Sequence, residues 1–188
     1  YQVRMKLKVL FLILTLNISL IMSAESFGIV IHGGAGVMSG LSAQNQEEIH
    51  EKIRETLTAA YQILENGGSS LDSVELAVSM LEDSPLFNAG KGSVYNSDEK
   101  QEMDASIMDG KDRLTGAVAS VSIVKNPIRL ARKVAEETEH VLLVGEGAER
   151  FAKKIGVEIV DEQYFFHEER LERVKTLKKN ISKLDRDS

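Results

Sequence analysis

The chain contains no cysteine and no tryptophan, and aromatic residues make up only 5% of it. The absence of cysteine excludes disulfides, thiolate metal sites and a cysteine nucleophile. The scarcity of aromatic side chains argues against a surface on which nucleic-acid bases stack. Basic residues are outnumbered, 23 against 29 acidic ones, which gives a net charge of −6. Because no basic face is expected to replace the counterions of a phosphate backbone, we expect no nucleic-acid partner.

Several complete catalytic signatures are missing as well. No Gly-x-Ser-x-Gly elbow occurs, and His167 has no second histidine at the spacing of a zinc-binding helix. Gly34 and Gly36 begin a nucleotide-binding fingerprint, but Ser39 stands where its third glycine belongs. Gly-Lys-Gly-Ser at 90–93 breaks the order of a phosphate-binding loop. The residues alone therefore favour a ligand-binding or interaction domain without catalysis.

The first 26 residues differ from the rest of the chain. Lys6 and Lys8 form a basic start, and residues 9–21 are mostly apolar. Such a run is short for a bilayer span but fits the hydrophobic region of a signal peptide. We predict a signal peptide at 1–26, with residues 1–4 as extra translated sequence, and an exported protein, periplasmic or secreted, that is free of the membrane once the leader is removed. The alternative is a membrane anchor or a buried helix.

Beyond the leader, apolar periodicity predicts a soluble domain of mixed strands and helices, of α/β or α+β class. The strand at 114–124 is small and apolar along both faces, which is typical of a strand covered by layers on both sides. Pro127 fits the first position of a helix. The predicted elements are a buried strand at 27–32, helices at 43–66 and 69–82, a hairpin of strands at 103–108 and 114–124, a helix at 126–137, a strand at 141–144, a helix at 146–154 and a charged surface helix from 168.

Six short motifs follow one another between residues 27 and 155. They are Phe-Gly-Ile-Val-Ile-His-Gly-Gly-Ala-Gly at 27–36, Ser-Pro-Leu-Phe-Asn-Ala-Gly-Lys-Gly-Ser-Val at 84–94, Glu-Met-Asp-Ala-Ser-Ile-Met-Asp-Gly at 102–110, Gly-Ala-Val-Ala at 116–119, Asn-Pro at 126–127 and Val-Gly-Glu-Gly-Ala at 144–148. In order and spacing, these motifs together resemble the isoaspartyl peptidase/plant-type L-asparaginase family.

The resemblance implies an αββα sandwich of the N-terminal-nucleophile hydrolase type, of which this chain is the α-subunit half. Residues 27–165 would form the α half of the hydrolase domain, and residues 166–188 a charged helix and linker leading toward a cleavage site. In such proteins a precursor cuts itself before a threonine and the two fragments stay together. The implied partners are a β subunit from the same precursor and a second αβ pair.

The family's nucleophile opens a Thr-Val-Gly strand after the linker, and no threonine of this chain is followed by Val-Gly. The threonines are Thr15, Thr56, Thr58, Thr115, Thr138 and Thr176. We therefore expect the catalytic threonine downstream of Ser188, no catalytic residue in this chain, and no hydrolysis of β-aspartyl peptides or asparagine by the chain alone. The alternatives are a truncated, non-catalytic product or a binding domain without hydrolase activity.

The resemblance also implies supporting roles within this chain. Asn88 would reach the active site and hold the nucleophile, and Gly33 and Gly34 would form a tight loop beside it, where a Cβ would clash. A structural sodium ion would be held by main-chain oxygens, and no other cofactor is expected; the oxygens are those of Leu81, Glu82, Ser84, Phe87, Ala89 and Lys91. The alternative for Asn88 is an Asx turn, and for the glycines simple turn positions. For Asp104 and Asp109 we expect structural roles.

Overall fold

The computed structural model describes residues 27–34 and 40–187. The predicted signal peptide lies outside these residues, as does the end of the first motif at 35–36. Among the described residues, no helix combines the length and the apolar character needed to cross a membrane.

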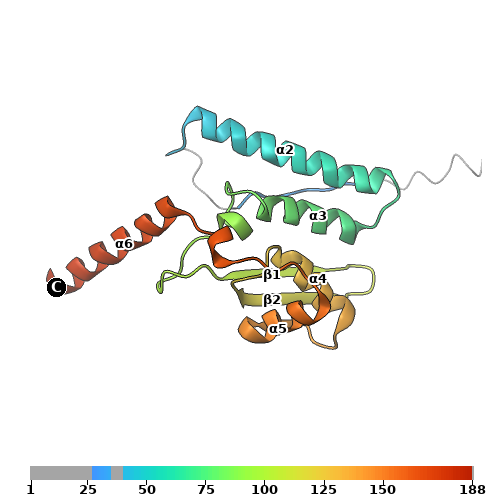
Figure 1. The fold of residues 1–188 in the computed structure, drawn as a ribbon. Helices are drawn as coiled ribbons and strands as arrows, with labels where there is room; N and C mark the ends of the chain where they lie inside the picture. Colours follow the sequence, from blue (N-terminus) through green and yellow to red (C-terminus); the bar gives the residue numbers. More distant parts are fainter. Residues whose placement is uncertain (1–26, 35–39, 188) are drawn as a thin grey trace, which may run out of the picture.

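From residue 43 on, helices and strands follow one another in the predicted order, and most of the predicted bounds are close to the observed ones (Figure 1). Ser42 and Ser69 begin α2 and α3, and each hydroxyl accepts a hydrogen bond from the backbone N–H three residues on, at 3.1 Å. Pro127 opens α4 as predicted. The elements are α2 (Ala43–Glu65), α3 (Ser70–Glu82), η2 (Gly90–Gly92), β1 (Met103–Met108), β2 (Thr115–Val121), α4 (Pro127–Glu137), β3 (Leu142–Val144), α5 (Gly145–Ile155), η3 (Glu162–Tyr164) and α6 (Glu168–Asp187).

β2 is the central strand of the sheet, antiparallel to β1 and parallel to β3. A bulge at Ser120, with φ 54°, interrupts the β1–β2 register. The Asp104 carboxylate accepts the Ser120 N–H at 2.8 Å, and Glu102 accepts the Ser120 hydroxyl at 3.1 Å. Asp109 accepts the Lys111 N–H in the hairpin turn at 2.9 Å. The structural roles expected for Asp104 and Asp109 are therefore confirmed.

Helices cover one face of this sheet. α4 lies across β1 and β2, and α2 and α3 lie beyond it (Figure 1). Gly116 allows the close approach of α4, because a Cβ there would overlap the Ala131 carbonyl. The core between the sheet, α4 and α5 consists of Met103, Ile107, Val118, Val121, Val124, Ile128, Leu130, Ala131, Val134, Ala148, Ala152 and Phe165.

The opposite face of the sheet is open within the described residues, so this part of the chain covers β2 on one face only, and the second of the two predicted layers stays a prediction. Ala117 pairs with Leu142 and Ala119 with Val144, so these residues share one face. Leu142 and Val144 are 52% and 53% exposed. β2 also ends earlier than predicted, because the N–H of Ser122 bonds to the Glu149 carboxylate at 2.8 Å instead of to a strand.

The buried strand predicted at 27–32 is wrong. The segment has no regular secondary structure and runs beside α2 (Figure 1), with Val30 95% exposed. A strand needs a neighbour to pair its backbone groups, and none of the described strands lies beside this segment. Its one ring contact joins Phe27 to Tyr61 of α2, with ring centroids 5.3 Å apart.

Candidate functional site

A cavity of about 940 Å³ lies where the N-terminal segment, α2, the loop after α3 and α6 meet. Gly33 and Gly34 line it, and so does Asn88, which follows Gly34 by 54 residues in sequence. Its wall includes Ile53 of α2 and Arg170 of α6. The fold therefore brings the three predicted supporting residues to one place, while their roles in a reaction stay predictions.

Gly33 and Gly34 are restricted by different features of the structure. A Cβ on Gly33 would lie 3.1 Å from Ile53 Cδ1 and 3.2 Å from Phe87 Cε1, so packing leaves little room. Gly34 has φ 100°, a conformation that favours glycine, but the space around it is open. Its N–H donates to His32 Nδ1 at 3.1 Å, so His32 shapes this turn. Packing therefore restricts Gly33 and backbone conformation selects Gly34, while the clash expected beside the nucleophile stays a prediction for both.

Asn88 closes the loop that carries it. Its Oδ1 accepts the N–H of Val94 at 3.0 Å, six residues along the chain, so this is not an Asx turn, which bonds two residues on. The residue is exposed at the cavity. Within the described part of the chain the side-chain Nδ2 has no hydrogen-bond partner. Asn88 therefore keeps an amide donor available for a group that enters the cavity.

The predicted sodium loop turns its carbonyl groups inward around two glycines. Gly90, with φ 48°, packs against the Glu82 carbonyl, and Gly92 packs against those of Phe87 and Pro85, so neither position has room for a Cβ. The Ala89 oxygen accepts one loop N–H, from Gly92 at 2.9 Å, and keeps a second lone pair, whereas the Leu81 oxygen accepts the N–H groups of both Asp83 and Ser84, the latter at 3.2 Å. Among the described residues no group of three acidic or histidine side chains could hold a metal. The loop fits a hard cation bound by main-chain oxygens, and this site stays a prediction.

The side chain of Glu82 is separate from this predicted cation site and contacts α4. This side chain is 3% exposed, and Oε1 accepts the N–H of Ile128 in the first turn of α4 at 3.0 Å. The other oxygen, Oε2, has no partner among the described residues. Burial raises the pKa of this carboxyl group to about 8, although the hydrogen bond from Ile128 opposes the shift.

Sequence reasoning missed Arg170, which it placed in a linker. Its guanidinium donates to the carbonyl oxygens of Pro85, at 3.0 Å, and Gly92, on either side of Asn88. Burial lowers the pKa of Arg170, but a guanidinium stays protonated in proteins. Arg170, Val174 and Leu177 recur at helical spacing along the cavity wall, a pattern that could have indicated a packed helix.

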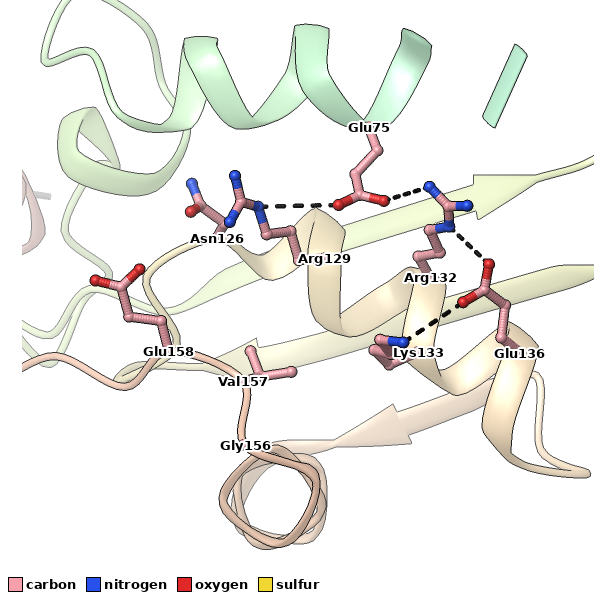
Figure 2. A pocket seen from close by; sticks show the side chains of 9 residues that line it. All are labelled: Glu75, Asn126, Arg129, Arg132, Lys133, Glu136, Gly156, Val157 and Glu158. Atoms are coloured by element: carbon pink, nitrogen blue, oxygen red, sulfur yellow. Dashed lines mark hydrogen bonds and ion pairs between the residues drawn. The ribbon is translucent and has the colours of Figure 1, made fainter. Parts of the chain in front are cut away.

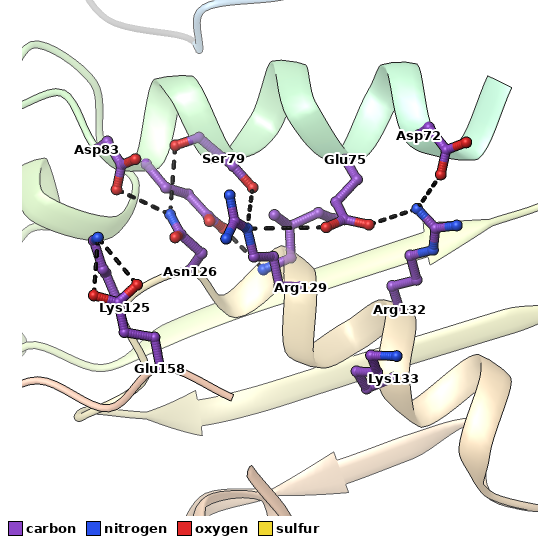
Figure 3. A network of polar contacts seen from close by, with 12 residues as sticks. Asp72, Glu75, Ser79, Asp83, Lys125, Asn126, Arg129, Arg132, Lys133 and Glu158 are labelled. Atoms are coloured by element: carbon purple, nitrogen blue, oxygen red, sulfur yellow. Dashed lines mark hydrogen bonds and ion pairs between the residues drawn. The ribbon is translucent and has the colours of Figure 1, made fainter. Parts of the chain in front are cut away.

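A second, smaller cavity of about 440 Å³ lies between α3, α4 and the turn after α5, and its charges are paired (Figure 2). Arg132 bonds Glu75 at 2.6 Å and both Asp72 and Glu136 at 2.7 Å. Arg129 also donates to the Ser79 hydroxyl, and Asn126, just before α4, donates to Asp83 at the end of α3 (Figure 3). These contacts join α3 to α4, so we interpret this cavity as a structural seam.

Comparisons with known proteins agree with the resemblance noted in the sequence. The sequence model of a family described as Asparaginase matches residues 25–187. The chain is 51% identical over 132 residues to an isoaspartyl peptidase/L-asparaginase of Rattus norvegicus, covering 70% of this chain and 39% of the relative. It is 48% identical over 153 residues to a plant-type L-asparaginase of Thermococcus kodakarensis, covering 81% and 48%. A Bos taurus isoaspartyl peptidase/L-asparaginase is 45% identical over 160 residues, covering 84% and 51%. The chain thus spans about half the length, or less, of these curated relatives.

Proposed function

Because this chain belongs to the asparaginase family, we propose that it is the α portion of an autoprocessing isoaspartyl peptidase/L-asparaginase. Its substrates would be β-aspartyl peptides and asparagine, and its nucleophile a threonine in a β portion downstream of Ser188. The observation that carries the proposal is the cavity where Gly33, Gly34 and Asn88 meet. The names of the relatives support it, and so does the finding that this chain covers only 39% and 48% of two of them.

The proposed chemistry needs a free N-terminal threonine. Its α-amine, with a pKa of about 7.7–8.0, would take the proton of the hydroxyl beside it. The hydroxyl oxygen attacks the side-chain carbonyl carbon of asparagine or the isopeptide carbonyl of a β-aspartyl peptide. The C–N bond breaks, ammonia or an amine leaves with the proton, and an ester to the threonine remains. Water hydrolyses that ester and releases aspartate.

Residues of this chain would prepare the site for that threonine. The glycines at 33 and 34 let a second backbone approach the cavity closely, since no Cβ projects from them. The Asn88 Nδ2 would donate to the threonine or to the oxygen that becomes negative during attack, where one donor is worth on the order of 10²-fold in rate. The carbonyl-lined loop would bind a structural sodium ion and so fix the position of Asn88.

The open face of the sheet gives the β portion a place to dock. Leu142, Val144 and Met108 expose apolar surface there, next to the small residues Ala117 and Ala119. Strands of the β portion would cover this face as a second sheet and complete the sandwich, and two such αβ pairs would form a dimer. Burial of these side chains gives the association its driving force.

The test is reconstitution. The chain purified alone should hydrolyse neither asparagine nor β-aspartyl dipeptides, and it should self-associate through its open sheet face. Co-expression with a downstream portion that begins with a free threonine should give a soluble complex and release aspartate from both substrates. The same portion with alanine in place of that threonine should restore solubility but not turnover. Turnover by the isolated chain, or none by the complex, would refute the proposal.

A further inference from the structure

We propose that Arg170 is a positioning residue that holds the site loop, defined as residues 85–95, closed over the cavity and so couples α6 to Asn88. The hydrogen bonds from Arg170 to the loop are seen directly in the structure. Their catalytic consequence rests on the proposed function, because Asn88 matters to a reaction only if the cavity is an active site.

The guanidinium of Arg170 joins the two arms of the site loop. One N–H donates to the Pro85 carbonyl at 3.0 Å and another to the Gly92 carbonyl. Asn88 lies between these two positions in the chain. A planar guanidinium presents several donors in a fixed fork, so binding both carbonyls fixes the distance between the arms. A single ammonium group on a flexible stem does not impose that geometry.

The interior of the loop transmits this constraint to Asn88. Gly92 packs against the carbonyls of Pro85 and Phe87 so closely that no Cβ fits. Asn88 Oδ1 accepts the Val94 N–H at 3.0 Å, two residues beyond the carbonyl that Arg170 holds. Opening the Arg170 contact would let the arms separate, and the bond from Val94 to Asn88 would lose its support.

Two further contacts, one from the residue before α6 and one from α6 itself, lie on either side of Arg170 and reach Tyr95 of the site loop and Glu99 beyond it. The His167 N–H donates to the Tyr95 hydroxyl at 3.1 Å, and Lys178 pairs with Glu99 at 3.0 Å. Beyond these contacts α6 extends away from the body of the molecule (Figure 1), with Ile181 exposed. Arg170 is part-buried, whereas the Lys178–Glu99 pair is exposed and adds little. Arg170 is therefore the principal link between α6 and the candidate site.

The direct test is hydrogen exchange of the site-loop amides, above all the N–H groups of Gly92, Ser93 and Val94. Arg170→Ala should speed their exchange on the order of 10-fold, because hydrogen bonds to a charged group are lost. Arg170→Lys keeps the charge but not the fork and should recover only part of the protection. Arg150→Ala is the matched control, since this exposed arginine pairs with Glu146 of its own helix; it should leave the loop unchanged.

The functional test uses the complete protein, comprising this chain and the proposed downstream portion. Arg170→Ala should slow autocleavage and lower kcat on the order of 10-fold with KM little changed, because it misplaces Asn88 without removing a substrate contact. Unchanged exchange in Arg170→Ala, or wild-type exchange in Arg170→Lys, would overturn the inference. If Arg170→Ala does not fold, the lysine variant decides alone. If the wild-type protein neither cleaves itself nor turns over substrate, the proposed function fails, and exchange still tests the contact.

Discussion

The side chain of Glu82, at the end of α3, caps the first turn of α4 through the N–H of Ile128, 3.0 Å away. The capping position of α4 itself, Asn126, makes no such bond and instead donates from its side chain to Asp83 at 3.1 Å and to Ser79. A buried carboxyl group thus joins the helix that leads into the site loop to the helix that covers the sheet.

The raised pKa of Glu82 predicts a pH-dependent stability. The folded protein holds this proton up to about pH 8, whereas the unfolded chain releases it near the ordinary value of 4.5. Between these values the folded state binds more protons, so the free energy of unfolding falls as pH rises, by up to about 1.4 kcal/mol per pH unit. Glu82→Gln keeps an acceptor for Ile128 and should remove this slope.

Thermal unfolding midpoints measured from pH 5 to pH 8 check that expectation. Glu139→Gln, which removes an exposed carboxyl group after α4, serves as the control and should keep the wild-type slope. A Glu82→Gln variant whose midpoint changes with pH just as the wild type does would show that Glu82 is not the titrating group.

Two substitutions of Asn88 separate its acceptor from its donor. Asn88→Asp keeps the oxygen that accepts the Val94 N–H but removes the Nδ2 donor, whereas Asn88→Ala removes both. If the donor serves the reaction, both variants should slow autocleavage and turnover of the complete protein on the order of 10²-fold. Asn66→Ala, at the end of α2, is the control. Wild-type rates in Asn88→Asp would mean that the residue only closes its loop.

Gly116 should not tolerate a methyl group. A Cβ there would overlap the Ala131 carbonyl and lie 2.8 Å from the Ala135 Cβ, so Gly116→Ala must push α4 away from β2. We expect a loss of about 1–3 kcal/mol in the free energy of unfolding, measured by denaturant titration. Gly110→Ala, in the hairpin turn with no atom near the added Cβ, should change it far less. Equal effects of the two substitutions would contradict the packing argument.

The proposed export gives a simple expectation. Expressed with residues 1–26, the protein should lose this leader and accumulate outside the cytoplasm, because the basic start and short apolar run are typical of a signal peptide. Mass spectrometry of the purified protein reads its first residue directly. Soluble cytoplasmic protein that still carries Met5 would contradict the proposal.

The sequence by itself determined the helices, the hairpin and the family. Periodicity and capping signals are local, so Ser42, Ser69 and Pro127 predicted where α2, α3 and α4 begin. The same local signals wrongly predicted a strand at 27–32, because an apolar run becomes a strand only when a neighbouring strand pairs with its backbone. Sequence periodicity shows that a segment is apolar, but it does not show which surface covers it.

Only the tertiary structure decided how the candidate site is assembled. Gly33, Asn88 and Arg170 carry no sequence signal that relates them, and they meet because α6 returns to the loop after α3. The contacts of Arg170 are with main-chain carbonyls, which every residue possesses, so no pattern of side chains could have indicated them. For the same reason the cap that Glu82 provides to α4, 46 residues away, depends on how the helices pack and not on their individual sequences.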